Sequence, residues 1–300
     1  MKKVKVTILV ILAGVFLINL VVLLAAPYWS PRVVTHRIIQ MDSSVQTLWV
    51  RNNIFIGEDQ QSYLVSGDGR VYILGSDERK TPSKIMAFEA ATGEQLWATR
   101  KYIGTALMYQ NGYLFVGGIG EVISFHPREG TRMWSKRLPL GRSVYELYLI
   151  DDVLYADMGT RFYAMSPQTG EILQEVNGSD FEDEPPFWRN PPDGWETFLG
   201  GRISLHRAAG WVSWDAEETF ISRVAINRSK LFALTEDGQL LQIDLTTGIT
   251  TRLVVFEPTP FIRQNEVGNQ FHFYVSSDTH YLFAYLGDSG QLFAFELSGK

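Results

Sequence analysis

The sequence predicts an all-β protein built from repeated four-stranded antiparallel units, and three observations support this. An eleven-residue pattern recurs along the chain, short apolar strand-like runs precede its copies, and the copies follow one another at a nearly constant interval. The pattern is clearest at 87–97, where the chain reads AFEAATGEQLW. A steady period of about 40 residues, made of short strands, indicates a β-propeller or a solenoid.

Each copy has a glycine at its seventh position. The residues are Gly93, Gly130, Gly170, Gly210 and Gly248, so the copies are spaced almost evenly. Glycine adopts positive φ angles without steric cost, so each is expected to form the turn between two strands. A shortened sixth copy occupies 294–300.

The third position of each copy is polar, and the residues there are Glu89, His126, Ser166, His206 and Asp244. A short side chain of this kind can accept hydrogen bonds from the exposed amides of the turn. His126 and His206 occupy the same position in the second and fourth units, so two units of rotation separate them. We therefore expect a polar role at the end of each turn rather than a shared metal site.

Tryptophan occupies the eleventh position in three copies, as Trp97, Trp134 and Trp214. It lies on the strand after the turn, where a large ring can fill the space between adjacent sheets. The run VQTLWVR at Val45–Arg51 resembles this strand and adds Trp49. We expect these four tryptophans to dock neighbouring blades together, and truncating such a ring costs about 3–5 kcal/mol.

Val45–Arg51 has no turn before it, whereas the C-terminal copy has a turn and no strand after it. The two halves complete each other, so we expect 45–51 to pair with the C-terminal strand and hide two edges. A solenoid would need caps instead of matching halves. The sequence thus predicts a six-bladed β-propeller over 45–300, with six blades favoured over seven or eight.

Residues 1–27 are predicted to be a membrane anchor. Lys2, Lys3 and Lys5 precede Val6–Ala26, which is almost wholly apolar. As a helix it would extend roughly 31 Å, enough to cross a bilayer, and the lysines favour a cytoplasmic N-terminus. A cleaved signal peptide is the alternative. Residues 28–44 read as a linker, so the propeller is expected outside the cell membrane, periplasmic or extracellular.

The composition excludes several classes of function. The chain contains no cysteine, which removes thiolate catalysis and cysteine-based metal sites. Its formal net charge is −6, and after Pro27 the chain has 24 basic and 33 acidic residues. An acidic ectodomain argues against binding of nucleic acid.

The units AFEAATGEQLW and AMSPQTGEIL resemble the repeat of the pyrroloquinoline-quinone (PQQ) type propellers, whose consensus is similar to A-L-D-x-x-T-G-x-x-x-W. The resemblance implies a propeller with tryptophan docking between blades. That family includes quinoprotein dehydrogenases and non-enzymatic members such as the outer-membrane assembly lipoprotein. This chain departs from both, with six copies instead of the usual eight, no lipobox cysteine and no adjacent cysteine pair. We expect it to be closer to the non-enzymatic branch, without PQQ.

No catalytic residues, metal site or cofactor site stand out in the sequence. Asp180, Glu182, Asp183 and Glu184 could bind calcium, but a run of acids beside two prolines is more often a solvated segment. The favoured function is a protein-interaction scaffold or an accessory subunit of an envelope complex. The alternative is a propeller that binds a quinone, a glycan or a signal molecule, or a PQQ-dependent dehydrogenase.

One segment is the candidate partner-binding site. In 177–195, four prolines interrupt any inner strand, and large aromatic residues stand among acids. Aromatic residues flanked by charge are typical of binding hot spots, and the residues are Phe181, Phe187, Trp188 and Trp195. We expect the chain to enter the propeller on the side of the Thr-Gly turns. The opposite rim, where the longer connections at 76–84, 174–196 and 252–281 are expected, then points away from the membrane.

The anchor gives a topological prediction. Protease added to spheroplasts should degrade the propeller, and the mature N-terminus should begin at or next to Met1. A mature chain that starts near Pro27 would show that the anchor is a cleaved signal peptide.

Overall fold

A computed structural model describes the protein at 34–56, 63–77, 83–100, 102, 104–139, 141–159, 161–177, 196–199, 202–207, 210–215, 220–222, 224–260 and 273–298. At 196–215 the description covers the backbone strands alone. The chain divides into two compact units, Met1–Val34 and Thr35–Lys300. The second unit contains every strand described below.

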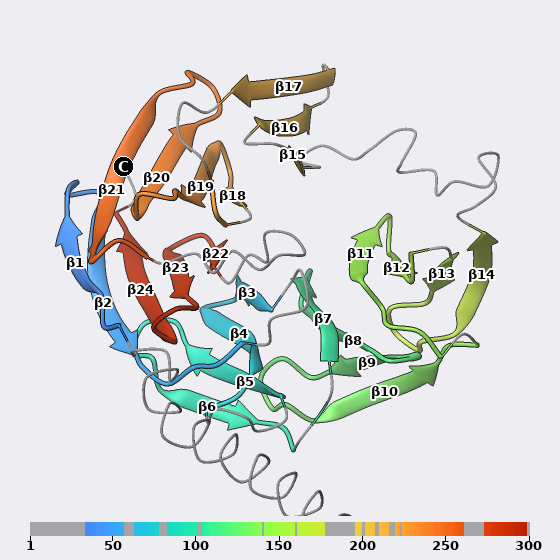
Figure 1. The fold of residues 1–300 in the computed structure, drawn as a ribbon. Coiled ribbons are helices and arrows are strands. Elements are labelled where there is room, and N and C mark those ends of the chain that lie inside the picture. The colour runs from blue at the N-terminus through green and yellow to red at the C-terminus, as the bar shows by residue number, and fades with distance from the viewer. Residues whose placement is uncertain are drawn as a thin grey trace, which may run out of the picture. The chain divides into compact units, whose positions relative to one another are not determined.

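The strands of this unit form antiparallel sheets in which most neighbours along the chain pair with each other (Figure 1). The first sheet contains β3 (Leu64–Gly67), β4 (Arg70–Gly75), β5 (Lys84–Glu89) and β6 (Gln95–Ala98). The second contains β7 (Gly104–Gln110), β8 (Tyr113–Gly118), β9 (Glu121–Phe125) and β10 (Arg132–Arg137). The third contains β11 (Glu146–Ile150), β12 (Val153–Asp157), β13 (Arg161–Met165) and β14 (Ile172–Asn177).

The remaining sheets differ more from one another. The fourth contains β15 (Glu196–Leu199), β16 (Arg202–Arg207) and β17 (Gly210–Asp215). The fifth contains β18 (Ala225–Asn227), β19 (Lys230–Leu234), β20 (Gln239–Asp244), β21 (Thr250–Glu257) and β1 (Arg37–Gln40). The sixth contains β22 (Phe273–Ser277), β23 (Tyr281–Leu286), β24 (Gln291–Leu297) and β2 (Val45–Arg51).

The all-β prediction is confirmed, and the antiparallel four-stranded unit is observed in four of the six sheets formed by the described residues. The expectation of four strands in every blade is wrong for the fifth sheet, because β1 adds a fifth strand to it. Over the described residues the fourth sheet has three strands, and the proline-rich segment 178–195 that precedes them lies outside the described residues.

The ends of the second unit meet in the sixth sheet. Strand β2 pairs antiparallel with β24, with Val45 opposite Leu297 and Arg51 opposite Leu292 (Figure 1). The same N-terminal segment bonds across to the turn of the first sheet, where the Arg51 guanidinium donates to the Gly93 carbonyl at 2.6 Å. Because β2 belongs to the sixth sheet by hydrogen bonding and contacts the first by its side chains, it joins the last sheet to the first.

Apolar side chains fill the spaces between neighbouring sheets. One buried cluster joins residues of the sixth, first and second sheets, another joins the fifth and sixth, and a third joins the second and third. The innermost strands follow the same order, with β18 next to β22, β22 next to β3, β3 next to β7 and β7 next to β11. Burial of apolar area stabilises a fold by about 25 cal/mol per Å², so these sheet-to-sheet contacts hold the unit together.

The sequence predicts that 28–44 is a linker that becomes extended, and the structure shows that its residues Arg37–Gln40 form a strand of the fifth sheet. These residues form β1, which pairs with β21 so that Arg37 lies opposite Glu257 and Gln40 opposite Val254. The sequence THRIIQ contains β-branched residues that favour an extended strand. It was assigned to a linker because it lacks the turn and tryptophan of the repeat, and its partner strand lies near the other end of the chain.

Strand β1 also reverses the expected entry side. His36 bonds to the carbonyl of Pro258, which follows β21, and to Asp288, in the turn between β23 and β24. Both residues lie on the face opposite the Thr-Gly turns. The strand β21 begins after its Thr-Gly turn and ends at Glu257, at the other face, and the turn from β23 to β24 lies at the corresponding end of the sixth sheet. Within the second unit, β1 therefore begins at the face opposite the Thr-Gly turns and runs along β21. The chain reaches the Thr-Gly face before β2 begins.

Over the residues that the structure describes, no helix is long and apolar enough to cross a membrane. The predicted anchor, Val6–Ala26, lies outside them.

The closure gives a prediction about truncation. Removing 1–34 should leave the melting temperature nearly unchanged. Removing 1–43 also deletes β1 and should lower the melting temperature by several degrees, because each kcal/mol of lost stability lowers it by about 2–4 °C. Removing 1–51 deletes β2 and the Trp49 ring, a loss of about 3–5 kcal/mol for the ring alone, and should unfold much of the unit. Calorimetry of the three truncated proteins measures this order, and equal melting temperatures would contradict it.

Candidate interaction surface

The described tryptophans of the repeat make the same contact with the following sheet. The indole Nε1 of Trp49 donates to the Ala90 carbonyl at 2.8 Å, that of Trp97 to Pro127 at 3.0 Å, and that of Trp134 to Pro167 at 3.0 Å. Each acceptor is the fourth residue of the next copy. A buried indole N–H needs a partner, and this carbonyl supplies it in every case, so the repeat spacing fixes how adjacent sheets dock.

The turn glycines are required for a second reason besides their backbone angle. Gly93, Gly130 and Gly170 have φ angles of 71°, 67° and 72°. A Cβ atom on them would lie 2.7 Å from the ring of Trp49, 2.5 Å from that of Trp97 and 2.5 Å from that of Trp134. The ring of one sheet therefore lies directly on the bare glycine of the next, and no other residue fits there without displacing it.

The first position of the first two copies is small for a related reason. Ala87 lies between Tyr72 and Trp97 in the register across the first sheet, and the two rings are 6.0 Å apart. Ser124 lies between Phe115 and Trp134 in the same way, with ring centroids at 5.7 Å. A small residue on the third strand lets the aromatic rings of the second and fourth strands meet over it. This produces the alternation of large and small side chains seen in the sequence.

A β-bulge precedes the docking position. The ladder register shifts between Gln95 and Trp97, between Arg132 and Trp134, and between Thr47 and Trp49, so the residue in between has no partner opposite it. A bulge re-aims the side chain that follows it. Here it accompanies the turning of the tryptophan toward the next sheet.

The bulged residues of the first three outer strands are apolar and exposed. Leu96, Met133 and Leu173 expose 41%, 55% and 58% of their surface, on β6, β10 and β14. Large exposed aliphatic side chains thus recur at one repeat position, three residues after the turn glycine, on the outer strands of three sheets, and we call these three residues the apolar row. Sequence reasoning missed this row, although the shared tenth position of the copies would have indicated it.

The polar third position acts within the turns. Asp244 Oδ1 accepts the amides of Thr246 and Thr247, both at 2.8 Å, and Ser166 Oγ accepts the Thr169 amide at 3.3 Å. The Thr247 and Thr246 amides hold the pKa of the Asp244 carboxyl below its ordinary value. Glu89 instead accepts a hydrogen bond from the Thr92 hydroxyl at 2.7 Å. Asp244 and Ser166 thus cap turn amides and Glu89 bonds a turn side chain, so all three belong to the fold of the turn.

His126 lies at the same turn position in the second sheet, and its Nδ1 is buried with no hydrogen-bond partner among the described residues. His206 lies on β16 of the fourth sheet, so the two histidines belong to separate sheets. The described residues contain no group of three or more potential ligands that could hold a metal ion. The candidate calcium residues, Asp180 and 182–184, lie outside them.

The assignment of Gly210 to a repeat turn is wrong. Gly210 is the first residue of β17 and pairs with Arg207 of β16, so that Trp214 lies opposite Ile203. In the other copies the turn is longer. The side chain at the third or the sixth position of the copy accepts a hydrogen bond from a turn amide, as Asp244 does from Thr247 and Thr92 does from Glu94. In this copy the third position is His206 and the sixth is Ala209, so the sixth position has no polar side chain.

The proposed partner-binding aromatics, Phe181, Phe187, Trp188 and Trp195, lie outside the described residues. Their role stays a prediction, and so does the docking of the Trp214 ring, since only the backbone of β17 is described. The described candidate surface therefore consists of the docked turns and the apolar row of Leu96, Met133 and Leu173.

Comparison with known proteins supports the repeat assignment. Residues 46–180 match the family model PQQ_2, described as outer membrane protein assembly factor BamB. No curated protein sequence matches the chain.

Solved structures give the fold. A chain from a crystal structure of the mitotic checkpoint complex aligns with a TM-score of 0.57 at 14% identity, over 89% of this chain and 99% of that one. BamB from Moraxella catarrhalis aligns at 12% identity and a TM-score of 0.35, over 89% of this chain and 99% of that one. A europium-containing methanol dehydrogenase aligns at 11% identity and a TM-score of 0.37, over 75% of this chain and 55% of that one. At 14% identity, the likeness to the checkpoint-complex chain concerns the fold alone.

The tryptophan–glycine contact gives a prediction. Gly130→Ala should destabilise the protein by about 1–2 kcal/mol through its positive φ angle, and by about 1–3 kcal/mol more by pushing the Trp97 ring away. Gly69→Ala is the matched control, because its φ is 70° and no atom lies within 4 Å of the added Cβ. Urea unfolding measures both variants. Equal losses would show that the ring does not constrain the turn.

Proposed function

Because the chain is a PQQ-like β-propeller that resembles BamB, we propose that it is a membrane-anchored, extracytoplasmic scaffold of six blades that binds other envelope proteins. The observation that carries this proposal is the match of 46–180 to the BamB family model. The repeat geometry agrees with it, because polar side chains of the turns bond amides within the turns and the tryptophans pack neighbouring sheets together. Such a body offers large surfaces to partners.

We further propose that Val6–Ala26 is the anchor and that its N-terminus is cytoplasmic. The segment from Pro27 to Val34 could extend at most about 28 Å, and it leads into the face where His36 contacts Pro258 and Asp288.

We propose no enzymatic activity and no PQQ cofactor. The support is the resemblance to the assembly factor and the absence from the sequence of the adjacent cysteines found in many quinoprotein dehydrogenases. Purified protein given PQQ and calcium should therefore reduce no dye with alcohols or sugars. Turnover that an alanine substitution in the protein abolishes would contradict this proposal and favour the small-molecule alternative.

The partner surface can be tested by substitution. Phe187→Ala combined with Trp188→Ala should reduce capture of envelope partners at least about thirtyfold, as expected for a hot spot worth about 2 kcal/mol or more. The tagged full-length chain would be purified from detergent-solubilised membranes, and the captured proteins quantified by mass spectrometry.

The comparison variant is Met133→Ala with Leu173→Ala, which removes two exposed apolar side chains from β10 and β14. Both double variants should melt within a few degrees of the parent protein. If the comparison variant loses partners and Phe187→Ala with Trp188→Ala does not, the apolar row is the docking surface. If neither double variant loses partners, neither surface binds them, and the scaffold proposal fails for both surfaces.

A further inference from the structure

The outer edge of the fifth sheet shows how this fold binds an additional strand. Strand β1 lies antiparallel along β21, with Ile39 opposite Val255. The Met41 amide continues the ladder by donating to the Leu253 carbonyl at 2.9 Å. The outermost strand of a sheet thus accepts an extended segment through its backbone, which is the general mode of strand addition.

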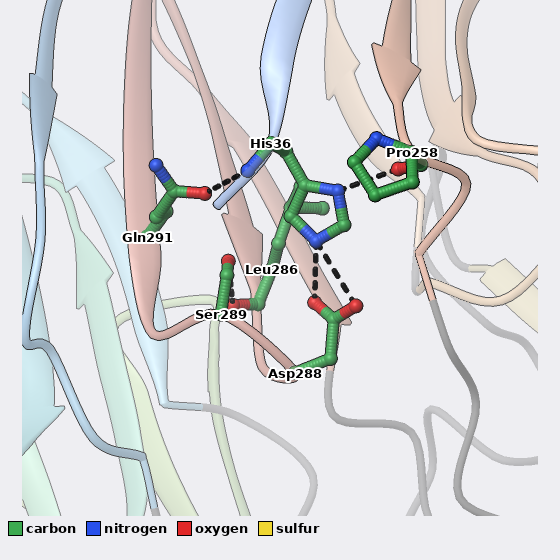
Figure 2. A network of polar contacts seen from close by, with 6 residues as sticks. All are labelled: His36, Pro258, Leu286, Asp288, Ser289 and Gln291. Atoms are coloured by element: carbon green, nitrogen blue, oxygen red, sulfur yellow. Dashed lines mark hydrogen bonds and ion pairs between the residues drawn. The ribbon is translucent and has the colours of Figure 1, made fainter. Parts of the chain in front are cut away.

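His36 anchors that added strand (Figure 2). Its backbone amide donates to Gln291 Oε1 at 2.7 Å, its Nδ1 lies 2.6 Å from the Pro258 carbonyl oxygen, and its Nε2 lies 3.0 Å from Asp288 Oδ1. Three of the four residues of β1 are exposed. Backbone hydrogen bonds and one buried side chain therefore hold β1, although most of its own surface faces solvent.

The alternation of an antiparallel ladder explains which residues of β21 bind β1. Every second residue of a strand bonds to the neighbour on one side, and the residues between them face the other side. The Phe256 amide donates inward to the Gly238 carbonyl at 2.9 Å, so the flanking residues, Val255 and Glu257, face outward. Strand β1 supplies their partners.

The same alternation defines the outer edge of β10 in the second sheet. The Leu138 amide donates inward to the Gly120 carbonyl at 2.9 Å, so the backbones of Ser135 and Arg137 face outward. Arg137 is the fourteenth residue counted from the start of its copy, as Val255 is in the fifth copy. Ser135 and Arg137 are both exposed. Among the strands that the structure describes, none pairs with this side of β10.

The charge of β10 indicates which kind of segment fits this edge. Its sequence, RMWSKR, contains Arg132, Lys136 and Arg137 and no acid. Within the described part of the chain, the side chains of these three residues form no hydrogen bond or ion pair. Glu121, opposite Arg137 in the ladder, is the one acid of the adjoining strand β9, so the edge keeps an excess of positive charge.

A charged edge selects its partner strand by the sign of the charge. Like charges on paired strands repel, and opposite charges attract. A second copy of this chain that paired through its own β10 would place cations against cations, and basic edge residues protect a sheet against such self-association. The occupant that fits is therefore an extended segment with acidic side chains.

We propose that the outer edge of β10 is a docking site at which an extended acidic segment of a partner protein adds to the second sheet as a fifth strand. The backbones of Ser135 and Arg137 supply the ladder bonds, and the three cations of β10 attract the acids. The inference rests on the proposed scaffold function, because it names the kind of segment that the scaffold binds. It does not use the side chains of the apolar row, because ladder bonds come from the backbone.

Hydrogen exchange of the full-length chain in detergent micelles tests this edge. The probe is a short peptide of alternating glutamate and valine with blocked ends, which combines acidic charge with strand propensity. Near saturation it should slow the exchange of the Ser135 and Arg137 amides at least about tenfold, because the added strand bonds both. The Ala98 amide is the internal control, because it faces outward from β6, whose sequence QLWA has no charge.

A matched peptide with lysine in place of glutamate should bind at least about tenfold more weakly, because like charges would meet on the edge. No protection of the Ser135 and Arg137 amides at millimolar acidic peptide would overturn the proposal. Equal binding of the two peptides, or equal protection of the Ala98 amide, would overturn it as well.

Substitution of Arg137 separates the backbone bonds from the charge. Arg137→Pro removes an outward amide and no inward one, and proline is tolerated at such edge positions. Arg137→Ala is the matched control, because it loses the same charge and keeps the amide. Arg137→Pro should weaken binding of the acidic peptide at least about fivefold beyond the effect of Arg137→Ala, through the lost hydrogen bond. Equal affinities of the two variants would contradict strand addition.

A second variant tests the charge if Arg137→Pro does not fold. Arg132→Gln with Lys136→Gln keeps every amide, and it should weaken binding of the acidic peptide and reduce its dependence on salt. Unchanged affinity and unchanged salt dependence would overturn the proposal.

Partner capture distinguishes this inference from the scaffold proposal. If the parent chain and Arg137→Pro capture envelope proteins equally, and the acidic peptide does not compete, the scaffold proposal stands and the docking edge is wrong. If the acidic peptide protects the β10 amides but the parent chain captures no envelope protein, the edge binds strands and the proposed scaffold function is wrong.

Discussion

The pairing of β2 with β24 is the interaction on which the rest of the structure depends. Each sheet has an outer strand with unpaired backbone groups and an apolar face that must be covered by its neighbour. Inside the chain the next repeat supplies that cover, but the first and last sheets have no sequence neighbour on one side. Strand β2 completes the last sheet and places Trp49 on Gly93 of the first. The tryptophan contacts of the first two sheets repeat this arrangement within the chain.

Much of this could be predicted from the sequence because the repeat is local. The turn glycines and the tryptophan at position eleven depend on residues within one unit or its neighbour. The missed features depend on longer separations or on the backbone. Arg37–Gln40 pairs with a strand near the other end of the chain, and the bulge that exposes Leu96 and Met133 is a backbone feature that simple alternation does not predict. Gly210 matched the pattern by its spacing, although the sixth position of its copy, Ala209, has no polar side chain.

The candidate site was harder to predict than the fold, for a physical reason. Packing constrains the positions that face another sheet, so they repeat and can be recognised. A docking surface faces solvent and is not constrained by the repeat, so only exposure identifies it. The apolar row became visible only when Leu96, Met133 and Leu173 were found on successive outer strands. The His36 contact was likewise invisible, because its three partners lie far along the chain.

The central claim is that the two ends of the second unit close it, and a disulfide trap measures this most directly. The natural chain has no cysteine, so a pair introduced by Gln46→Cys and Glu296→Cys is the only thiol pair present. These residues lie opposite each other in the ladder between β2 and β24, and opposed strand residues are about 4.5–5.5 Å apart at Cα, within the span of a disulfide. We expect rapid, near-complete intramolecular crosslinking under mild oxidation, seen as a mobility shift on non-reducing gels, and a raised melting temperature. No crosslink, or equal crosslinking of Gln46→Cys with Glu94→Cys, would contradict the closure.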